Sequence, residues 1–153
     1  MKQQNIQTKT FANGLTLIVV PMDDVKSAAV SLLVPAGSVF DPPGHNGSAS
    51  VLCEWIPRGA GDRDSKQLSA ALDNLGVQHS ESVGLVHLTF TGATLAESLP
   101  QALPLYADMI LRPWLPEDQF EAARSGVEQS LMAIEDEPRQ KIILELRRRC
   151  FDS

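Results

Sequence analysis

Three side chains able to act as nucleophiles or metal ligands, those of Ser50, Cys53 and Glu54, lie close together in the sequence. Their segment is predicted to form a helix over residues 46–57, because its apolar residues recur at helical spacing: Ala49, Leu52, Cys53 and Ile56. Ser50 and Glu54 are four residues apart and therefore share one face of that helix. A hydroxyl, a thiol and a carboxylate placed in this way suit either nucleophilic catalysis or metal binding.

The three histidines of the chain, His45, His79 and His87, are the other candidates for chemistry. A metal site built from His45, Cys53, Glu54 and His79 is one hypothesis, but this spacing fits no known ligand pattern. A nucleophilic pair of Cys53 with a histidine is another, although no Asn or Asp can be placed beside it as an orienting group. Cys53 also lies on the apolar stripe, where burial would keep its thiol protonated and inert. Ordinary surface or strand histidines are the simpler interpretation.

The composition indicates one acidic, globular domain. The chain has 153 residues, of which 43% are hydrophobic and 21% charged, so it can bury a core. Its net charge of -6 argues against a nucleic-acid partner, because phosphates require a basic surface. The one basic cluster, Arg147 to Arg149, is interpreted as a solvated helix end that suits the helix dipole.

The sequence also bears on the cellular compartment. Residues 1–5 contain no apolar signal-peptide core, and no apolar run approaches the length that spans a membrane. Cys53 and Cys150 form no Cys-x-x-Cys pair and are predicted to be free thiols. These features predict a cytoplasmic chain with no membrane partner.

Two hairpins and one long strand supply the predicted β structure. The expected strands are residues 8–11, 15–20, 25–36, 77–83 and 85–93. Asn13-Gly14, a strong turn signal, separates the first two strands, and Gly84 separates the last two. In the last strand, alternation places Val86, Leu88 and Phe90 on one face and His87, Thr89 and Thr91 on the other.

Helical patterns fill the space between the strand groups. Beyond the first helix, further helices are predicted from Ser65, as N-cap, to Gly76, over residues 95–111, from Pro116 onward, and over residues 139–150. The helix after Pro116 has an inward stripe of Phe120, Ala123, Val127, Leu131 and Ile134. This order predicts an α+β domain, with a mostly antiparallel sheet and helices packed on one face. The last helix has no capping residue, so we expect the single domain of residues 1–153 to be partial and to continue in a longer protein.

Six short segments carry a resemblance to a known protein family through their joint order and spacing. They are Phe11-Ala-Asn-Gly-Leu-Thr-Leu17, Ala29 to Gly37, Gly47 to Ala60, Leu68 to Gly76, Arg112-Pro-Trp-Leu-Pro-Glu117 and Ile134-Glu-Asp-Glu-Pro138. Together they resemble the N-terminal domain of the M16 metallopeptidases, the family of insulinase, pitrilysin and mitochondrial processing peptidase. The resemblance spans about residues 7–152 and implies a LuxS/MPP-like metallohydrolase fold.

The resemblance also implies that the catalytic positions are replaced. Active members carry zinc-binding His-x-x-Glu-His at this helix. In register, Ser50 stands for the first histidine, Cys53 for the general base and Glu54 for the second histidine. Ser130, counted back from Glu135-Asp136, stands for the downstream glutamate ligand. A serine hydroxyl is a poor zinc ligand at neutral pH, so no cofactor is expected here, although active relatives bind zinc.

Three functions remain open at this point. The first is a non-catalytic domain that forms a heterodimer with an active M16 zinc peptidase domain or subunit and encloses a chamber with it. The second is an assembly subunit with no proteolytic role, similar to the core subunits of a respiratory complex. The third is a divergent hydrolase that uses Cys53. On the first two hypotheses the chain alone is not an enzyme.

The resemblance singles out one strand as a binding element, with the residues Val77, Gln78, His79, Ser80 and Glu81. In active relatives the comparable strand is an edge that receives an extended peptide by strand addition. The alternative is a plain edge strand covered by a neighbour. If the domain lacks further strands, an unpaired sheet edge also favours homo-oligomers through edge-to-edge pairing.

Overall fold

The computed structural model describes residues 5–151, apart from the side chains of Glu135, Gln140, Arg147, Arg148 and Phe151. Its strands are β1 (Gln7–Thr10), β2 (Thr16–Val19), β3 (Ser27–Val34), β4 (Gly59–Ala60), β5 (Arg63–Asp64), β6 (Gln78–Val83) and β7 (Leu88–Leu95). Its α-helices are α1 (Ser48–Trp55), α2 (Ser65–Asn74), α3 (Leu99–Leu111), α4 (Phe120–Glu135) and α5 (Pro138–Phe151). Short 3-10 helices are η1 (Ser38–Phe40), η2 (Ile56–Arg58) and η3 (Glu117–Gln119).

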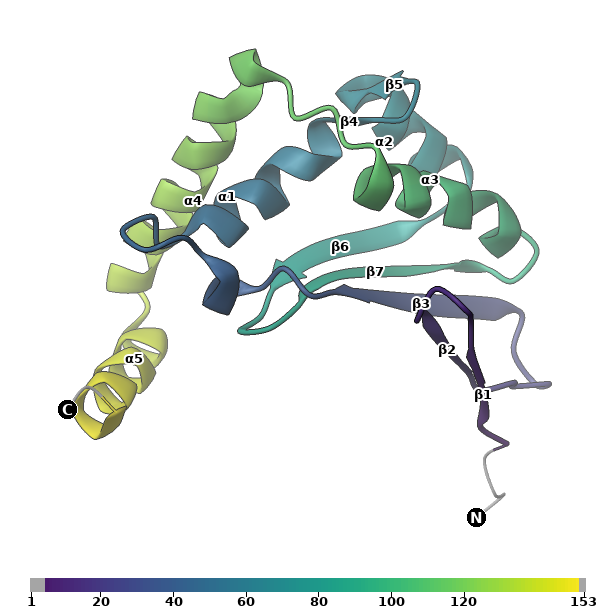
Figure 1. The fold of residues 1–153 in the computed structure, drawn as a ribbon, viewed down its shortest axis with the longest axis horizontal. Helices are drawn as coiled ribbons and strands as arrows, with labels where there is room; N and C mark the ends of the chain where they lie inside the picture. Colours follow the sequence, from purple (N-terminus) through teal and green to yellow (C-terminus); the bar gives the residue numbers. More distant parts are fainter. Residues whose placement is uncertain (1–4, 152–153) are drawn as a thin grey trace.

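The main sheet consists of β3, β7 and β6 in that order, and both pairings are antiparallel. Helices α1, α2 and α3 lie over one face of this sheet, and no described helix covers the other face (Figure 1). The core fills the space between these layers, with Leu88 and Phe90 from β7, Leu68 and Leu72 from α2, and Tyr106 and Met109 from α3. The predicted α+β class, with an antiparallel sheet and helices on one face, is confirmed.

Two small hairpins accompany the main sheet. Strands β1 and β2 pair with each other around the predicted Asn13-Gly14 turn and form a separate two-stranded sheet. Strands β4 and β5 form a second hairpin, which the sequence patterns did not reveal because each strand is only two residues long. Among the described helices, none combines the length and apolarity needed to cross a bilayer.

The start of α2 differs from the prediction by one residue. Asp64, not Ser65, is the N-cap: its carboxylate accepts the backbone N–H of Gln67 at 2.8 Å. The Gln67 side chain in turn accepts the backbone N–H of Asp64 at 3.0 Å, which completes a capping box. A carboxylate is favoured over the following hydroxyl because it also interacts with the positive end of the helix dipole.

The predicted second strand of the later hairpin begins too early. Residues 84–87 form a turn rather than a strand, so Val86 is 46% exposed and His87 precedes β7. The turn is held by the segment before η1, since Gly37 donates its N–H to the Val86 carbonyl oxygen at 3.0 Å. A Cβ on Gly37 would come within 2.5 Å of this backbone, so only glycine allows the close approach.

Three helix predictions also need correction. Helix α3 begins at Leu99 and not at Leu95, because β7 continues its pairing with β3 as far as Leu95. The turn η3 separates Pro116 from α4. Leu131 is 60% exposed despite its place in the predicted stripe. The 16-residue α4 is twice as long as α1, the helix that it packs against, and the buried part of its stripe is Ala123.

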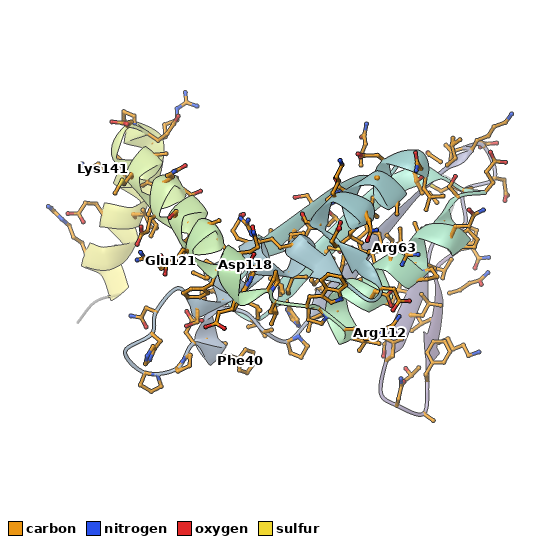
Figure 2. The ribbon with its side chains drawn as sticks, turned by 90° about the horizontal axis from the view of Figure 1, so that it is seen from above. Phe40, Arg63, Arg112, Asp118, Glu121 and Lys141 are labelled. Atoms are coloured by element: carbon orange, nitrogen blue, oxygen red, sulfur yellow. The ribbon has the colours of Figure 1, made fainter. Side chains whose placement is uncertain are left out.

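The linker between α3 and α4 is fixed by the β4–β5 hairpin. Trp114 donates its backbone N–H to the Gly59 carbonyl oxygen at 2.9 Å and its indole N–H to that of Gly61 at 2.7 Å. Arg63 of β5 and Arg112, both labelled in Figure 2, pair with the same Asp108 carboxylate at 3.6 and 2.6 Å. These contacts hold the start of α4 in place, and so define where α4 lies against α1.

Candidate functional site

Helix α1 carries three of the four candidate positions and is anchored at its N-terminus by a residue outside it. The Asp41 carboxylate accepts the backbone N–H groups of Gly47 at 2.7 Å and Ala49 at 2.8 Å. A free helix N-terminus leaves such donors unpaired, and a carboxylate both satisfies them and complements the dipole. The helix gives way to η2 at Pro57, which lacks the N–H needed to continue it.

The three α1 positions lie in three different environments. Ser50 is half-buried, Cys53 is 8% exposed and belongs to the core, and Glu54 is exposed. The predicted burial of Ala49, Leu52, Cys53 and Ile56 on one face agrees with the structure, where Leu52 is half-buried and the other three are buried. Glu54 therefore faces away from the core.

Helix α4 brings the fourth position, Ser130, to the same region. A Cβ built on Gly126 would lie 3.9 Å from the Glu54 carboxylate, so this glycine of α4 faces Glu54 directly. Ser130 lies one helical turn further along, and its hydroxyl donates to the Gly126 carbonyl oxygen at 3.0 Å. The packing of α1 on α4 therefore places Ser130 one helical turn from the residue that faces Glu54.

The chemistry of Cys53 is determined by its surroundings. Burial, with smaller contributions from the negative charges of Glu81 and Glu54, raises the pKa of the Cys53 thiol to about 11. At pH 7 about one thiol in ten thousand is then ionised, and only the thiolate is a nucleophile or a metal ligand. Cys53 is therefore a buried core residue, as its place on the apolar stripe predicted, and its raised pKa disfavours the reactive thiolate.

Strand β6 forms the other wall of the region. On its helix-facing side, His79 Nδ1 lies 3.0 Å from a Glu81 carboxylate oxygen, and the Glu81 side chain is only 12% exposed. The carboxylate also influences the core, since its charge adds to burial in raising the pKa of Tyr106 to about 12. Val77, predicted as part of this strand, instead precedes it. Its backbone N–H bonds to the Leu72 carbonyl oxygen of α2 at 3.0 Å, and its side chain is 6% exposed.

A hollow of about 270 Å³ opens where α1, α2 and the start of β6 meet. Its lining combines apolar and polar side chains: Glu54, Pro57, Arg58, Ser65, Leu68, Ser69, Leu72 and His79. Two of the candidates weighed from the sequence, Glu54 and His79, thus line one hollow. His45 does not join them: it lies exposed in the loop before α1, with its ring nitrogen 3.2 Å from the Pro43 carbonyl oxygen.

These groups do not suit a catalytic zinc. Such a site needs about three nitrogen, oxygen or sulfur ligands and an open position for water. The in-register side chains offer one exposed carboxylate, one thiol with a pKa of about 11 and two neutral hydroxyls, which are poor zinc ligands. Among the described residues, no group of three His, Cys, Asp or Glu side chains is placed to hold a metal ion.

Sequence reasoning named Glu81 as part of the candidate binding strand, but it overlooked the burial of the Glu81 carboxylate and the anchoring of α1 by Asp41. Asp41, which positions α1, gave one signal: a short acidic residue a few positions before a helix whose first turn has no acidic residue. Glu81 gave none beyond its place among polar residues of a predicted edge strand, because burial of a carboxylate depends on the packing of α1 and β6.

Comparison with known proteins agrees with this geometry. The family model described as Insulinase (Peptidase family M16) matches residues 17–151. An uncharacterized zinc protease of Rickettsia bellii is 25% identical over 136 residues, which cover 89% of this chain and 33% of that protein. The β subunit of mitochondrial processing peptidase from Saccharomyces cerevisiae is 24% identical over 79% of this chain and 26% of that protein. The chain thus spans a third or less of these relatives.

Solved structures show the same fold. The inactive M16 peptidase domain from Pseudomonas fluorescens superposes with a TM-score of 0.82 at 20% identity, covering 95% of this chain and 35% of that chain. Pitrilysin superposes with a TM-score of 0.74 at 26% identity, covering 86% of this chain and 14% of that chain.

Proposed function

Because this chain belongs to the insulinase family of M16 peptidases, we propose that it is a non-catalytic member that partners an active zinc-peptidase domain or subunit in forming a proteolytic chamber. The observation that carries the proposal is that α1 has an intact structural frame but lacks the side chains of a zinc site. The frame of the helix is fully formed, with Asp41 at its start and α4 packed beside it. The side chains within that frame supply neither a zinc ligand set nor a general base.

Two similar proteins support the pairing of a non-catalytic chain with an active peptidase subunit. The domain from Pseudomonas fluorescens, which has the same fold, is described as an inactive domain. The yeast relative is described as one subunit of a processing peptidase. A family in which one polypeptide is inactive and another is a subunit accommodates a chain that contributes structure to a peptidase without contributing zinc.

The uncovered face of the main sheet suits the wall of a water-filled chamber. The side chains that point away from the helices are small or polar, with Leu33 and Leu95 as exceptions: Ala29, Ser31, Gln78, Ser80, Ser82, Thr89, Thr91 and Ala93. Hydroxyl groups keep hydrogen bonds to water there at no desolvation cost. A hollow of about 440 Å³ on the strands β3, β6 and β7 adds room for a substrate segment.

Strand β6 is the element that would hold an extended peptide. It lies at one end of the sheet, so one side of its backbone has no strand partner among the described residues. Its side chains are mostly exposed and polar, which leaves that backbone accessible. A peptide added to β6 would gain main-chain hydrogen bonds, while alternate side chains would meet α1 on one face and solvent on the other. Gln78, His79, Ser80 and Glu81 are the positions concerned.

The test combines a metal assay with reconstitution. The purified chain should contain no stoichiometric zinc and should not cleave peptides, whereas addition of its partner peptidase, isolated by affinity capture from the native cell, should give chelator-sensitive cleavage. Omission of this chain should lower the cleavage rate. Stoichiometric zinc in the chain alone, together with chelator-sensitive cleavage, would refute the proposal.

An assembly subunit is the second candidate function. It is favoured by the apolar side chains that remain exposed on the last two helices, including Leu131, Met132, Ile142 and Leu146. An exposed apolar surface of this kind marks a protein contact. Capture from the native cell separates the two candidates, because an assembly subunit would be recovered in a stable complex that contains no zinc peptidase.

A further inference from the structure

We propose that the hollow between α1, α2 and β6 accepts a lysine or arginine side chain of a peptide paired with β6, with Glu54 as its counter-ion. The inference rests on the proposed peptide-binding role of β6 and adds the substrate class that this strand would select. It gives a function to the carboxylate that stands where active relatives have a zinc ligand.

The geometry of β6 determines which peptide side chains reach the hollow. His79 pairs with Gly92 and Glu81 with Phe90, and since Phe90 is in the core, His79 and Glu81 lie on the helix-facing side of the sheet. A strand added beyond β6 would lie about 4.8 Å away, with every second side chain on that same side. One of these side chains would therefore stand beside His79, at the mouth of the hollow that His79 lines.

The walls of the hollow suit a long cationic side chain. The half-buried Pro57 provides apolar surface against which a methylene stem can pack, and the core residues Leu68 and Leu72, each 1% exposed, lie beneath it. Ser65 and Ser69 add hydroxyl oxygens that can accept hydrogen bonds from an ammonium or guanidinium group. Ser65 and Ser69 are exposed, so they bond to water when no cationic side chain is present.

The negative charge of Glu54 at the hollow is what favours a cationic side chain over a neutral one. Glu54 is exposed, and no described cation lies within ion-pairing distance of its carboxylate. Arg58 also lines the hollow, but it donates to the Gln119 side-chain oxygen at 3.3 Å and to the Glu54 carbonyl oxygen at 3.1 Å. Because Gln119 is not part of the lining, this bond directs the guanidinium toward η3. The net charge of -6 further attracts cationic peptides over longer distances.

The experiment compares peptides that differ at one position. A fluorescent, uncharged, strand-forming host peptide carries lysine, norleucine or glutamate at its centre, and its affinity for the chain is measured by fluorescence anisotropy. Norleucine keeps the methylene stem and removes the charge. We expect the lysine peptide to bind about two- to fivefold more tightly than the norleucine peptide, as exposed ion pairs do, and this preference should disappear at high salt.

Two variants locate the preference. In Glu54→Gln the lysine and norleucine peptides should bind equally, whereas Glu97→Gln, which removes the same charge from an exposed loop residue before α3, should keep the preference. A preference that survives Glu54→Gln, or tighter binding of the glutamate peptide, would overturn the inference and leave strand addition standing. If none of the host peptides binds, strand addition to β6 is itself wrong, and the inference is lost with it.

Discussion

The substitution Asp41→Ala tests whether the frame of α1 is held from outside the helix. The Asp41 carboxylate makes two charge-assisted hydrogen bonds, at 2.7 and 2.8 Å, to the N–H groups of Gly47 and Ala49. Ala49 is 6% exposed, so water cannot fully replace the lost acceptor at its N–H group. Loss of a helix cap costs about 0.5–2 kcal/mol, and hydrogen bonds to a charged group contribute about 1.5–3 kcal/mol each. Since the two bonds share one carboxylate, we expect the free energy of unfolding to fall by about 2–3 kcal/mol.

Urea unfolding followed by Trp fluorescence measures this effect, because Trp55 ends α1 and contacts Phe120 of α4 edge-on, with ring centroids 5.0 Å apart. Asp41→Asn, which keeps one acceptor oxygen without the charge, should lose about half as much. Asp73→Ala is the matched control, since it removes an exposed carboxylate from α2 and should change the stability by less than about 0.5 kcal/mol. If Asp41→Ala and Asp73→Ala unfolded at the same urea concentration, the carboxylate would not be what anchors α1.

Two further predictions concern the core beside the site. Cys53 should resist a thiol reagent at pH 7, while the exposed Cys150 reacts. Because the pKa of Cys53 is raised from 9.0 to about 11, the buried thiol should contribute fully to the free energy of unfolding below pH 9, and this contribution should fall as the pH rises toward 11. Cys53→Ala should remove that part of the pH dependence, and rapid labelling of Cys53 in the folded protein would contradict the inferred burial. Gly92→Ala should cost about 1–3 kcal/mol, because its Cβ would overlap the Tyr106 hydroxyl, which donates to the Thr91 carbonyl oxygen at 3.0 Å. Adding Tyr106→Phe should recover part of that loss in urea unfolding, whereas an additive effect of the two substitutions would argue against the overlap.

Local patterns were sufficient to predict most of the elements. The Asn13-Gly14 turn, the apolar stripe of α1 and the alternation of Leu88 and Phe90 are all found in the structure, because each depends on residues near in sequence. Where the prediction failed, a distant contact decided the outcome. Residues 84–87 form a turn because they bond to Gly37, and Leu131 is exposed because α4 is longer than the helix that it packs against.

At the candidate site, too, the features set by residues near in sequence were predicted, and those set by distant contacts were not. The resemblance to M16 peptidases, followed in register, grouped Ser130 with the α1 positions, and in the structure α4 packs against α1 with Gly126 facing Glu54. The hollow, however, requires α2 and β6 to meet α1, and its lining comes from residues up to 25 positions apart (Glu54 and His79). No periodic pattern predicts such a meeting, so the burial of the Glu81 carboxylate and the hydrogen bonds of Arg58 are visible only in the packed structure.

The residues at the candidate site and the residues that hold its frame differ in what they support. Glu54 and Ser130 are exposed and Ser50 is half-buried, so the polar groups at these positions can change without disturbing the core. Asp41 instead accepts backbone N–H groups of α1, and its replacement would remove that anchor. Gly37 contacts the backbone of the 84–87 turn, and a larger residue there would displace the turn. Changes at the first group would therefore leave the shape of the helix pair and of β6 intact, whereas changes at the second would not. On the proposed function, that shape is what a partner domain and an extended peptide would contact, so it can be kept whether or not the first group binds a metal.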